Sequence, residues 1–192
     1  MYKKYFKRVI DIILSLLAII VLSPFLLLVI IAIKIDSKGP VFFLQPRIGK
    51  NQKLFSLYKF RTMTDKQRDP TKEQTYMDNP EITLVGRFLR RCKIDELPQL
   101  FNVLKGDMSI IGPRPALPEL YEQYGDLALK RLRVRPGLSG LSQTRGNIYL
   151  TWEKRFEYDN KYIDDLSFWL DIKIVMKTFL IIIFGEEKFI NQ

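Results

Sequence analysis

Residues 12–33 read IILSLLAIIVLSPFLLLVIIAI, and no charged side chain interrupts this run. Its length matches the roughly 20 apolar residues that a helix needs to cross the hydrocarbon core of a bilayer. A secretory signal would have a shorter apolar core and a small-residue cleavage site, and neither is visible between Ala32 and Pro40. We therefore predict a membrane segment that stays in the mature protein.

Two arrangements of this segment in a membrane compete. Length alone favours a single spanning helix. However, Ser23 and Pro24 lie at the midpoint of the run, where proline removes a helical hydrogen bond and kinks or breaks the helix. The Ser23 hydroxyl can satisfy a backbone carbonyl that such a break sets free. A helix broken at Ser23-Pro24 could return to the membrane face from which it started.

Basic residues flank the apolar run on both sides, which argues for such a return. The positive-inside rule places both flanks in the cytoplasm, and only a re-entrant hairpin satisfies both. The flanking residues are Lys3, Lys4, Lys7 and Arg8 before the run, and Lys34, Lys38, Arg47, Lys50 and Lys53 after it. We therefore predict that residues 1–38 form a helix-break-helix hairpin, in which Asp11 pairs with Lys7 or Arg8 at the membrane interface.

The composition limits both the partner and the chemistry. The chain of 192 residues has room for one domain beside the membrane segment, and its net charge of +10 favours an anionic partner. The single cysteine, Cys92, excludes an intrachain disulfide. The chain has no histidine, so neither a Ser-His nor a Cys-His nucleophile can form. Catalysis would have to use carboxylates, lysine, arginine or tyrosine.

Residues 39–192 are expected to form a small cytosolic catalytic domain of the α+β class that is mostly helical. The expected elements are strands at 41–44 and 53–60, a surface loop at 64–80, and helices at 84–91, 117–132 and 167–184. The last helix is rich in apolar and aromatic residues but contains charges. We therefore predict that it lies amphipathically at the membrane interface instead of spanning the bilayer.

The stretch 93–106, KIDELPQLFNVLKG, is the most informative of the soluble part. Apolar residues at helical spacing predict a buried helix face made of Leu97, Leu100, Phe101 and Leu104. Pro98 is tolerated only in the first turn of a helix, so the helix should begin near Asp95. Gly106 should end it.

Asp95 and Glu96 would then lie at a helix N-terminus. The free amides and the positive end of the helix dipole favour anions there, so both carboxylates should stay ionised. Such a pair of ionised acids could have a chemical role. The alternative is that Asp95 merely caps the helix, as aspartate often does.

Two downstream segments are candidates for binding phosphate. Arg114 lies between Pro113 and Pro115, which hold its backbone extended, and a fixed guanidinium suits bidentate contact with phosphate oxygens. A plain surface turn is equally compatible with this pattern. Residues 133–140, RVRPGLSG, could present backbone amides and arginines to an anion, or form an ordinary turn.

Taken together, these segments resemble the small bacterial sugar transferases, the monotopic phosphoglycosyl transferases that begin assembly of polyprenyl-linked glycans. The resemblance covers nearly the whole chain, because several blocks occur in the family's order. The blocks are Phe43-x-Gln45-x-Arg47-x-Gly49; Lys59-Phe60-Arg61-Thr62-Met63; Asp95-Glu96-Leu97-Pro98-Gln99-Leu100; Asn102-Val103-Leu104-x-Gly106-Asp107-Met108-Ser109; Gly112-Pro113-Arg114-Pro115; and Arg135-Pro136-Gly137-x-x-Gly140-x-x-Gln143.

The resemblance implies a re-entrant helix broken at Ser-Pro and a ping-pong reaction that depends on Mg²⁺. Asp95, close to the metal, would attack the sugar-linked phosphorus of a UDP-sugar, and UMP would leave. Polyprenyl (undecaprenyl) phosphate would then accept the phosphosugar, while Glu96 takes a proton or positions the acceptor phosphate. Lacking histidine does little harm, because phosphoryl transfer needs positioning and charge neutralisation more than strong bases.

The resemblance also implies a set of phosphate- and nucleotide-binding side chains, namely Arg90, Arg114, Lys59, Arg61, Arg145 and Arg47. Where many relatives read Asn-Gly-Arg-Asn after the glutamine, this chain reads Arg145-Gly146-Asn147, so the arginine is displaced. The implied partners are a UDP-sugar, polyprenyl phosphate and membrane lipid, at the cytoplasmic face of the bacterial inner membrane. A homodimer through the hairpin or the interfacial helix is compatible with the sequence.

We expect the minimal form of the family, without the extra N-terminal spans and preceding domain of the larger relatives. Two alternatives stay open. A membrane-anchored basic protein would bind nucleic acid or anionic lipid, but it would need no pair of acids, and no nucleic-acid-binding motif is apparent. We therefore expect no nucleic acid partner. A phosphohydrolase would pass the aspartyl intermediate to water and release sugar phosphate without added lipid.

Overall fold

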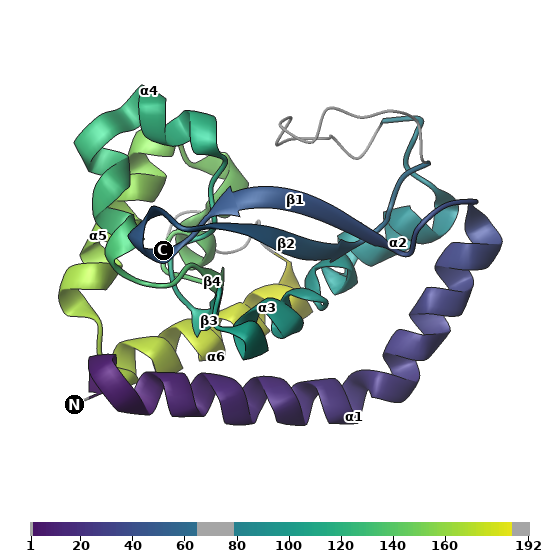
Figure 1. Ribbon diagram of the computed structural model, residues 1–192, viewed down its shortest axis with the longest axis horizontal. Helices are drawn as coiled ribbons and strands as arrows, with labels where there is room; N and C mark the ends of the chain where they lie inside the picture. The colour runs from purple at the N-terminus through teal and green to yellow at the C-terminus, as the bar shows by residue number, and fades with distance from the viewer. Residues whose placement is uncertain (1, 65–78, 186–192) are drawn as a thin grey trace.

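The computed structural model describes residues 2–64 and 79–185 (Figure 1). The loop expected at 64–80 therefore lies almost entirely outside the described residues. The described part combines helices with two small two-stranded sheets, which confirms the mostly helical α+β class.

The longest element is the N-terminal helix α1 (Lys7–Asp36), which follows one π-helical turn (Tyr2–Phe6). Of the kink or break expected at Ser23-Pro24, the structure has no break, because α1 continues through Pro24. Figure 1 shows instead that α1 bends, passing below α6 and α3 and then turning towards α2. Proline is a usual cause of such a bend, because its ring displaces one turn while the flanking hydrogen bonds persist. The Ser23 hydroxyl donates to the Ile20 carbonyl at 2.8 Å, as predicted.

The N-terminal end of α1 is fixed to the rest of the protein by polar contacts. Lys7 forms an ion pair with Asp171 at 2.6 Å, and the Arg8 guanidinium donates to the Val103 and Leu104 carbonyls at 2.6 and 2.8 Å. The prediction that Asp11 pairs with Lys7 or Arg8 is wrong. Asp11 is buried and accepts hydrogen bonds from the Ser109 hydroxyl and the Ile110 amide at 3.0 and 2.9 Å, because backbone donors at the start of strand β3 face it.

The C-terminal end of α1 is fixed to the same domain. The Asp36 carboxylate accepts a hydrogen bond from the Val85 amide at 3.0 Å, at the start of α2. Arg61 donates to the Ser37 carbonyl at 2.6 Å. Both ends of α1 therefore contact the domain that carries Asp95, although the helix is 30 residues long.

Between these ends, α1 is apolar and exposed. Within the described residues it is the one helix that is long and apolar enough to cross a membrane, and only 17% of its most apolar stretch is buried in the protein. A core helix of a soluble protein with this composition would be mostly buried, and exposed apolar surface of this extent is costly in water. This exposure is typical of a membrane-associated protein.

The first sheet is a hairpin of β1 (Phe42–Ile48) and β2 (Leu54–Phe60), joined by a 3-10 turn, and it confirms the two predicted strands. Helix α2 (Leu84–Arg91) confirms the next prediction and is capped by the Thr83 side chain. Helix α3 (Gln99–Lys105) packs on β2 through the buried Asn102 side chain. Its amide oxygen accepts from the Tyr58 amide at 3.0 Å and its amide nitrogen donates to the Ser56 carbonyl at 2.8 Å.

The second sheet pairs β3 (Ser109–Ile111) with β4 (Gly137–Ser139) in parallel. The contact is very close, because a Cβ at Gly137 would lie 2.0 Å from the Gly112 nitrogen. The Gly137 amide donates to the Pro113 carbonyl at 2.8 Å, and the Arg135 guanidinium donates to the Gly106 carbonyl at 2.7 Å. Segment 133–140 therefore uses these groups inside the fold, which favours its structural interpretation over anion binding.

Three helices complete the domain: α4 (Pro118–Leu129), α5 (Trp152–Asp165) and α6 (Phe168–Phe184). Helix α4 ends three residues before the predicted limit, where a 3-10 turn (Lys130–Arg133) takes over. Helix α5 was not predicted, since its many charges leave few apolar positions, yet it buries Phe156 and Tyr162 completely. Helix α6 confirms the predicted helix, while its place at a membrane interface stays a prediction.

Candidate active site

The chain reaches the acid pair through a tight turn. Lys93 adopts a left-handed backbone with φ of 56°, and a 3-10 turn (Ile94–Glu96) follows. Helix α3 begins only at Gln99, so the prediction that it starts near Asp95 is wrong, because Pro98 has no amide hydrogen and occupies the cap position. Asp95 donates or accepts no capping hydrogen bond, so the capping alternative is not supported either.

The buried face of α3 also differs from the predicted one. Leu100 is buried, but Phe101 is 42% exposed, while Asn102 and Val103 are fully buried. The polar Asn102 replaces an apolar residue on this face because it satisfies two backbone groups of β2. The predicted end of the helix at Gly106 is confirmed, with φ of 93° at that residue.

Glu96 is held by two cations. Its Oε1 atom lies 2.9 Å from Lys59 Nζ, on β2, and 2.9 Å from Arg114 Nη2. Burial alone would raise the pKa of this carboxyl, but the charges and hydrogen bonds of Arg114 and Lys59 outweigh burial and hold the pKa well below its usual range. Glu96 is therefore ionised at any physiological pH and is a poor proton acceptor.

Asp95, next to it, has a different environment. It is partly buried, and no hydrogen bond from the described residues holds its carboxylate. Burial and the negative charge of Glu96 raise the pKa of Asp95 to about 6, while Lys59, Arg90 and Arg114 act in the opposite direction. The carboxylate is thus mostly ionised at neutral pH, as predicted, although its pKa is raised and not lowered by its surroundings.

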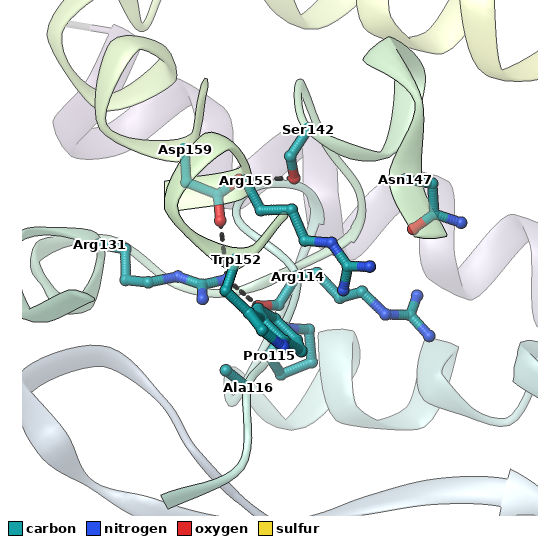
Figure 2. Close-up of a pocket in the computed structure, with 9 residues that line it drawn as sticks. All are labelled: Arg114, Pro115, Ala116, Arg131, Ser142, Asn147, Trp152, Arg155 and Asp159. Atoms are coloured by element: carbon teal, nitrogen blue, oxygen red, sulfur yellow. Dashed lines mark hydrogen bonds and ion pairs between the residues drawn. The ribbon is translucent and has the colours of Figure 1, made fainter. Parts of the chain in front are cut away.

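Arg114 is positioned by a buried network that sequence analysis did not find. Arg131 donates to the Arg114 carbonyl and forms an ion pair with Asp159 at 2.8 Å, and the Ser142 hydroxyl donates to Asp159 at 2.8 Å (Figure 2). Arg131 and Asp159 are 4% and 1% exposed. The network fixes the Gly-Pro-Arg-Pro segment, so that the predicted rigidity of Arg114 comes from the tertiary structure as well as from its prolines.

Arg155 is a further cation near Arg114 that the sequence did not indicate. Its guanidinium lies 4.3 Å from the centre of the Trp152 ring, and it donates to the Leu150 carbonyl at 3.2 Å. Figure 2 shows the Arg155 and Arg114 side chains extending in the same direction from one small pocket. Arg155 and Trp152 come from α5, the helix that the sequence pattern did not predict.

The structure brings together only some of the predicted phosphate-binding residues. Lys59 and Arg114 contact Glu96, and Arg90, which donates to Thr62 at 2.8 Å, is close enough to lower the pKa of Asp95. These three cations and the two acids form the candidate site.

The other predicted cations do not contact the acid pair. Arg47 is buried and donates to Gln45 at 2.7 Å, and Arg61 is buried and donates to Ser37. Neither hydrogen bond involves the acid pair, and phosphate binding by these two arginines stays a prediction. Arg145 is exposed in a 3-10 turn (Gln143–Arg145) near α6.

The acid pair fits a magnesium ion that is shared with a substrate. No group of three or more acidic or cysteine side chains lies together in the described parts of the chain, so these residues offer no complete protein cage for a metal. Mg²⁺ commonly keeps several waters and binds through one or two carboxylates together with substrate phosphates. Asp95, whose carboxylate is not hydrogen-bonded by any described residue, would supply such a ligand.

Comparison with known proteins identifies a family for the chain. A family model described as "Bacterial sugar transferase" matches residues 2–185. The chain is 43% identical to an undecaprenyl-phosphate glucose phosphotransferase of Komagataeibacter xylinus, over 95% of this chain and 37% of the relative. It is 45% identical to a UDP-glucose:undecaprenyl-phosphate glucose-1-phosphate transferase of Klebsiella pneumoniae, over 90% of this chain and 39% of the relative.

A third relative is comparable in length to this chain. It is an uncharacterized sugar transferase, EpsL, of Bacillus subtilis, which is 43% identical over 90% of this chain and 84% of the relative. The chain thus spans less than half of the first two relatives but most of the third. Because the family match covers almost the entire described structure, the protein belongs to the bacterial sugar transferase family.

Proposed function

We propose that the protein transfers a sugar 1-phosphate from a UDP-sugar to polyprenyl phosphate and releases UMP. The names of the relatives support the two substrates. The observation that carries the proposal is the contrast within the acid pair. Glu96 is neutralised by Lys59 and Arg114, whereas the adjacent Asp95 carboxylate accepts no hydrogen bond from residues 2–64 or 79–185 and has a pKa of about 6.

The contrast supports a nucleophilic role for Asp95. In the first step, an Asp95 oxygen would form a bond to the sugar-linked phosphorus while the bond from that phosphorus to UMP breaks, and the electron pair leaves with UMP. In the second step, a phosphate oxygen of the lipid acceptor would attack the same phosphorus and release the Asp95 carboxylate. Neither step needs a proton when the acceptor phosphate is ionised.

Glu96 would act through its cations. Its lowered pKa argues against the proton transfer that the family resemblance allowed, because a carboxylate paired with Lys59 and Arg114 is a weak base. We infer that Glu96 orients the two cations towards the phosphate oxygens, where negative charge must be neutralised. A bound Mg²⁺ would neutralise charge on the diphosphate, with Asp95 as its protein ligand.

The placement of α1 supports attachment to one membrane face. Both ends of α1 contact the domain that carries the acid pair, and the apolar middle is exposed. We propose that α1 enters and leaves the bilayer on the cytoplasmic side, with its bend inside the membrane. A helix that spanned the bilayer would separate two ends that the contacts of Lys7 and Asp36 hold on one domain.

The test uses purified protein, a panel of UDP-sugars, Mg²⁺ and polyprenyl phosphate. We expect UMP and a glycolipid to form with at least one sugar, and Asp95→Asn to abolish both. With donor alone, the peptide that contains Asp95 should gain the mass of the phosphosugar. Unchanged turnover by Asp95→Asn would remove Asp95 from its role, and release of sugar phosphate without lipid would indicate a hydrolase.

A further inference from the structure

A second cavity adjoins the acid pair and differs from it in polarity. It has a volume of about 240 Å³ and lies between the turn at Glu96, the β3–β4 sheet and helix α6. Lys93, Glu96 and Arg114 contribute charged groups to its lining. Apolar side chains of α6 also line it, among them Val175, Phe179 and Ile182.

The cavity lining is continuous with the exposed face of α6. Phe179 and Ile182 line the cavity and are also 59% and 58% exposed. The same helix exposes Met176 and Ile183, which do not line the cavity. A hydrocarbon chain could therefore pass from the apolar surface of α6 into the cavity without leaving apolar surroundings.

In the wall that α6 forms with β4, the Thr178 and Ser139 hydroxyls are already hydrogen-bonded inside the protein. Thr178 donates to the Ile174 carbonyl at 2.7 Å and lies 2.6 Å from the Ser139 hydroxyl, which can in turn donate to Thr178. A sugar placed against this wall would lose hydrogen bonds from its hydroxyls to water and gain few in return. An isoprenyl chain would instead gain from leaving water.

We propose that this cavity binds the phosphate-proximal isoprenyl units of the lipid phosphate acceptor, with Lys93 and Arg114 facing its phosphate. This inference rests on the proposed function and adds a subsite to it. Cavities that hold drug-sized ligands have roughly 300 to 1,000 Å³, so this cavity is too small for a long polyprenyl chain. The distal units would remain in the membrane, next to the exposed face of α6.

The test compares two double variants of α6. Phe179→Ala with Ile182→Ala truncates two apolar side chains that line the cavity, and Met176→Ala with Ile183→Ala truncates two exposed apolar side chains outside it. Both variants lose a similar amount of membrane-facing surface, and their folding is verified by thermal melting. Binding of geranyl phosphate, which has two isoprenyl units, is measured by titration calorimetry in detergent.

We expect the cavity variant to bind geranyl phosphate at least tenfold more weakly than the control variant, which corresponds to about 1.4 kcal/mol. The Michaelis constant for polyprenyl phosphate should rise in parallel, while that for the UDP-sugar stays unchanged. Equal affinities of the two variants would overturn the inference. A rise confined to the Michaelis constant for the UDP-sugar would also overturn it, because the cavity would then hold the donor.

The binding measurement separates this inference from the proposed function. If no UDP-sugar yields UMP but the cavity variant alone loses affinity for geranyl phosphate, the proposed reaction fails and the lipid subsite stands. If UMP and glycolipid form normally in both variants and binding is equal, the reaction stands and the subsite fails.

Discussion

The buried pair of Arg131 and Asp159 allows a prediction that separates stability from the positioning of Arg114. Arg131→Met removes the cation and leaves Asp159, which is 1% exposed, without its ion pair. Removing one partner of a buried ion pair costs about 3–5 kcal/mol. Since 1 kcal/mol shifts the melting temperature of a protein of this size by roughly 2–4 °C, we expect a decrease of about 6–20 °C.

The pH dependence of this loss follows from Asp159. Burial raises the pKa of its carboxyl in the folded protein, against the opposing charge of Arg131, and loss of Arg131 should raise that pKa further. A carboxyl whose pKa is raised by folding favours the folded state at low pH, where it is protonated, and this stabilisation is lost as pH rises through the folded pKa. The difference in melting temperature between Arg131→Met and the wild type should therefore be larger at pH 8 than at pH 5.

A matched variant tests whether Arg131 also positions Arg114. Arg131→Met combined with Asp159→Leu replaces the pair by apolar side chains, which is often neutral for stability, so most of the lost melting temperature should return. The hydrogen bond to the Arg114 carbonyl stays absent, and we expect kcat/KM to remain about tenfold to hundredfold below the wild type. Melting is followed by differential scanning fluorimetry and turnover by UMP release. An unchanged melting temperature in the single variant, or full activity in the double variant, would refute the reasoning.

Three further predictions concern the acid pair, its cations and α1. Burial and the charge of Glu96 raise the pKa of Asp95 to about 6 in the metal-free protein, so its carboxyl is protonated at pH 4 and ionised at pH 8. The raised pKa also means that ionised Asp95 destabilises the fold, so Asp95→Asn should melt about 2–4 °C higher than the wild type at pH 8 but not at pH 4. Arg114→Met should lower kcat/KM for the UDP-sugar about a hundredfold, whereas Arg61→Met should mainly lower the melting temperature. If the two variants lost equal amounts of kcat/KM, the assigned site would be contradicted. A membrane-impermeant reagent added to one side of the membrane should reach tags at both termini, and tags on opposite sides would exclude the hairpin. Pro24→Ala should straighten α1 and so weaken the contacts of one of its ends with the domain.

Local patterns were sufficient for several elements of the fold. The strands of the β1–β2 hairpin, helix α2, helix α6 and the end of α3 at Gly106 all follow from short-range signals of composition, turn residues and apolar spacing. Helix α5 could not be predicted in this way, because its sequence is dominated by charges. Its few buried side chains, such as Phe156, become part of the core only when α4 packs against them. The buried face of α3 was misassigned for a related reason, since Asn102 is buried to serve backbone groups of a strand that is distant in sequence.

For the acid pair too, the sequence indicated the residues and the tertiary structure their contacts. Motif and composition pointed to Asp95, Glu96 and Arg114 as candidates, but they could not show that Lys59 and Arg114 share one oxygen of Glu96 or that no described residue donates a hydrogen bond to Asp95. They also suggested Arg47 and Arg61 as phosphate ligands, although packing directs both to internal partners.

The sequence by itself determined that the protein has an uncharged apolar segment interrupted by proline, a basic charge balance and a chemistry without histidine, because these depend on residue type and near neighbours alone. Only the tertiary structure decided that both ends of α1 contact the domain that carries the acid pair, which cations face Glu96 and why the pKa of Asp95 rises. Those properties depend on distances between side chains that are tens of residues apart, and on the water that folding removes from around them.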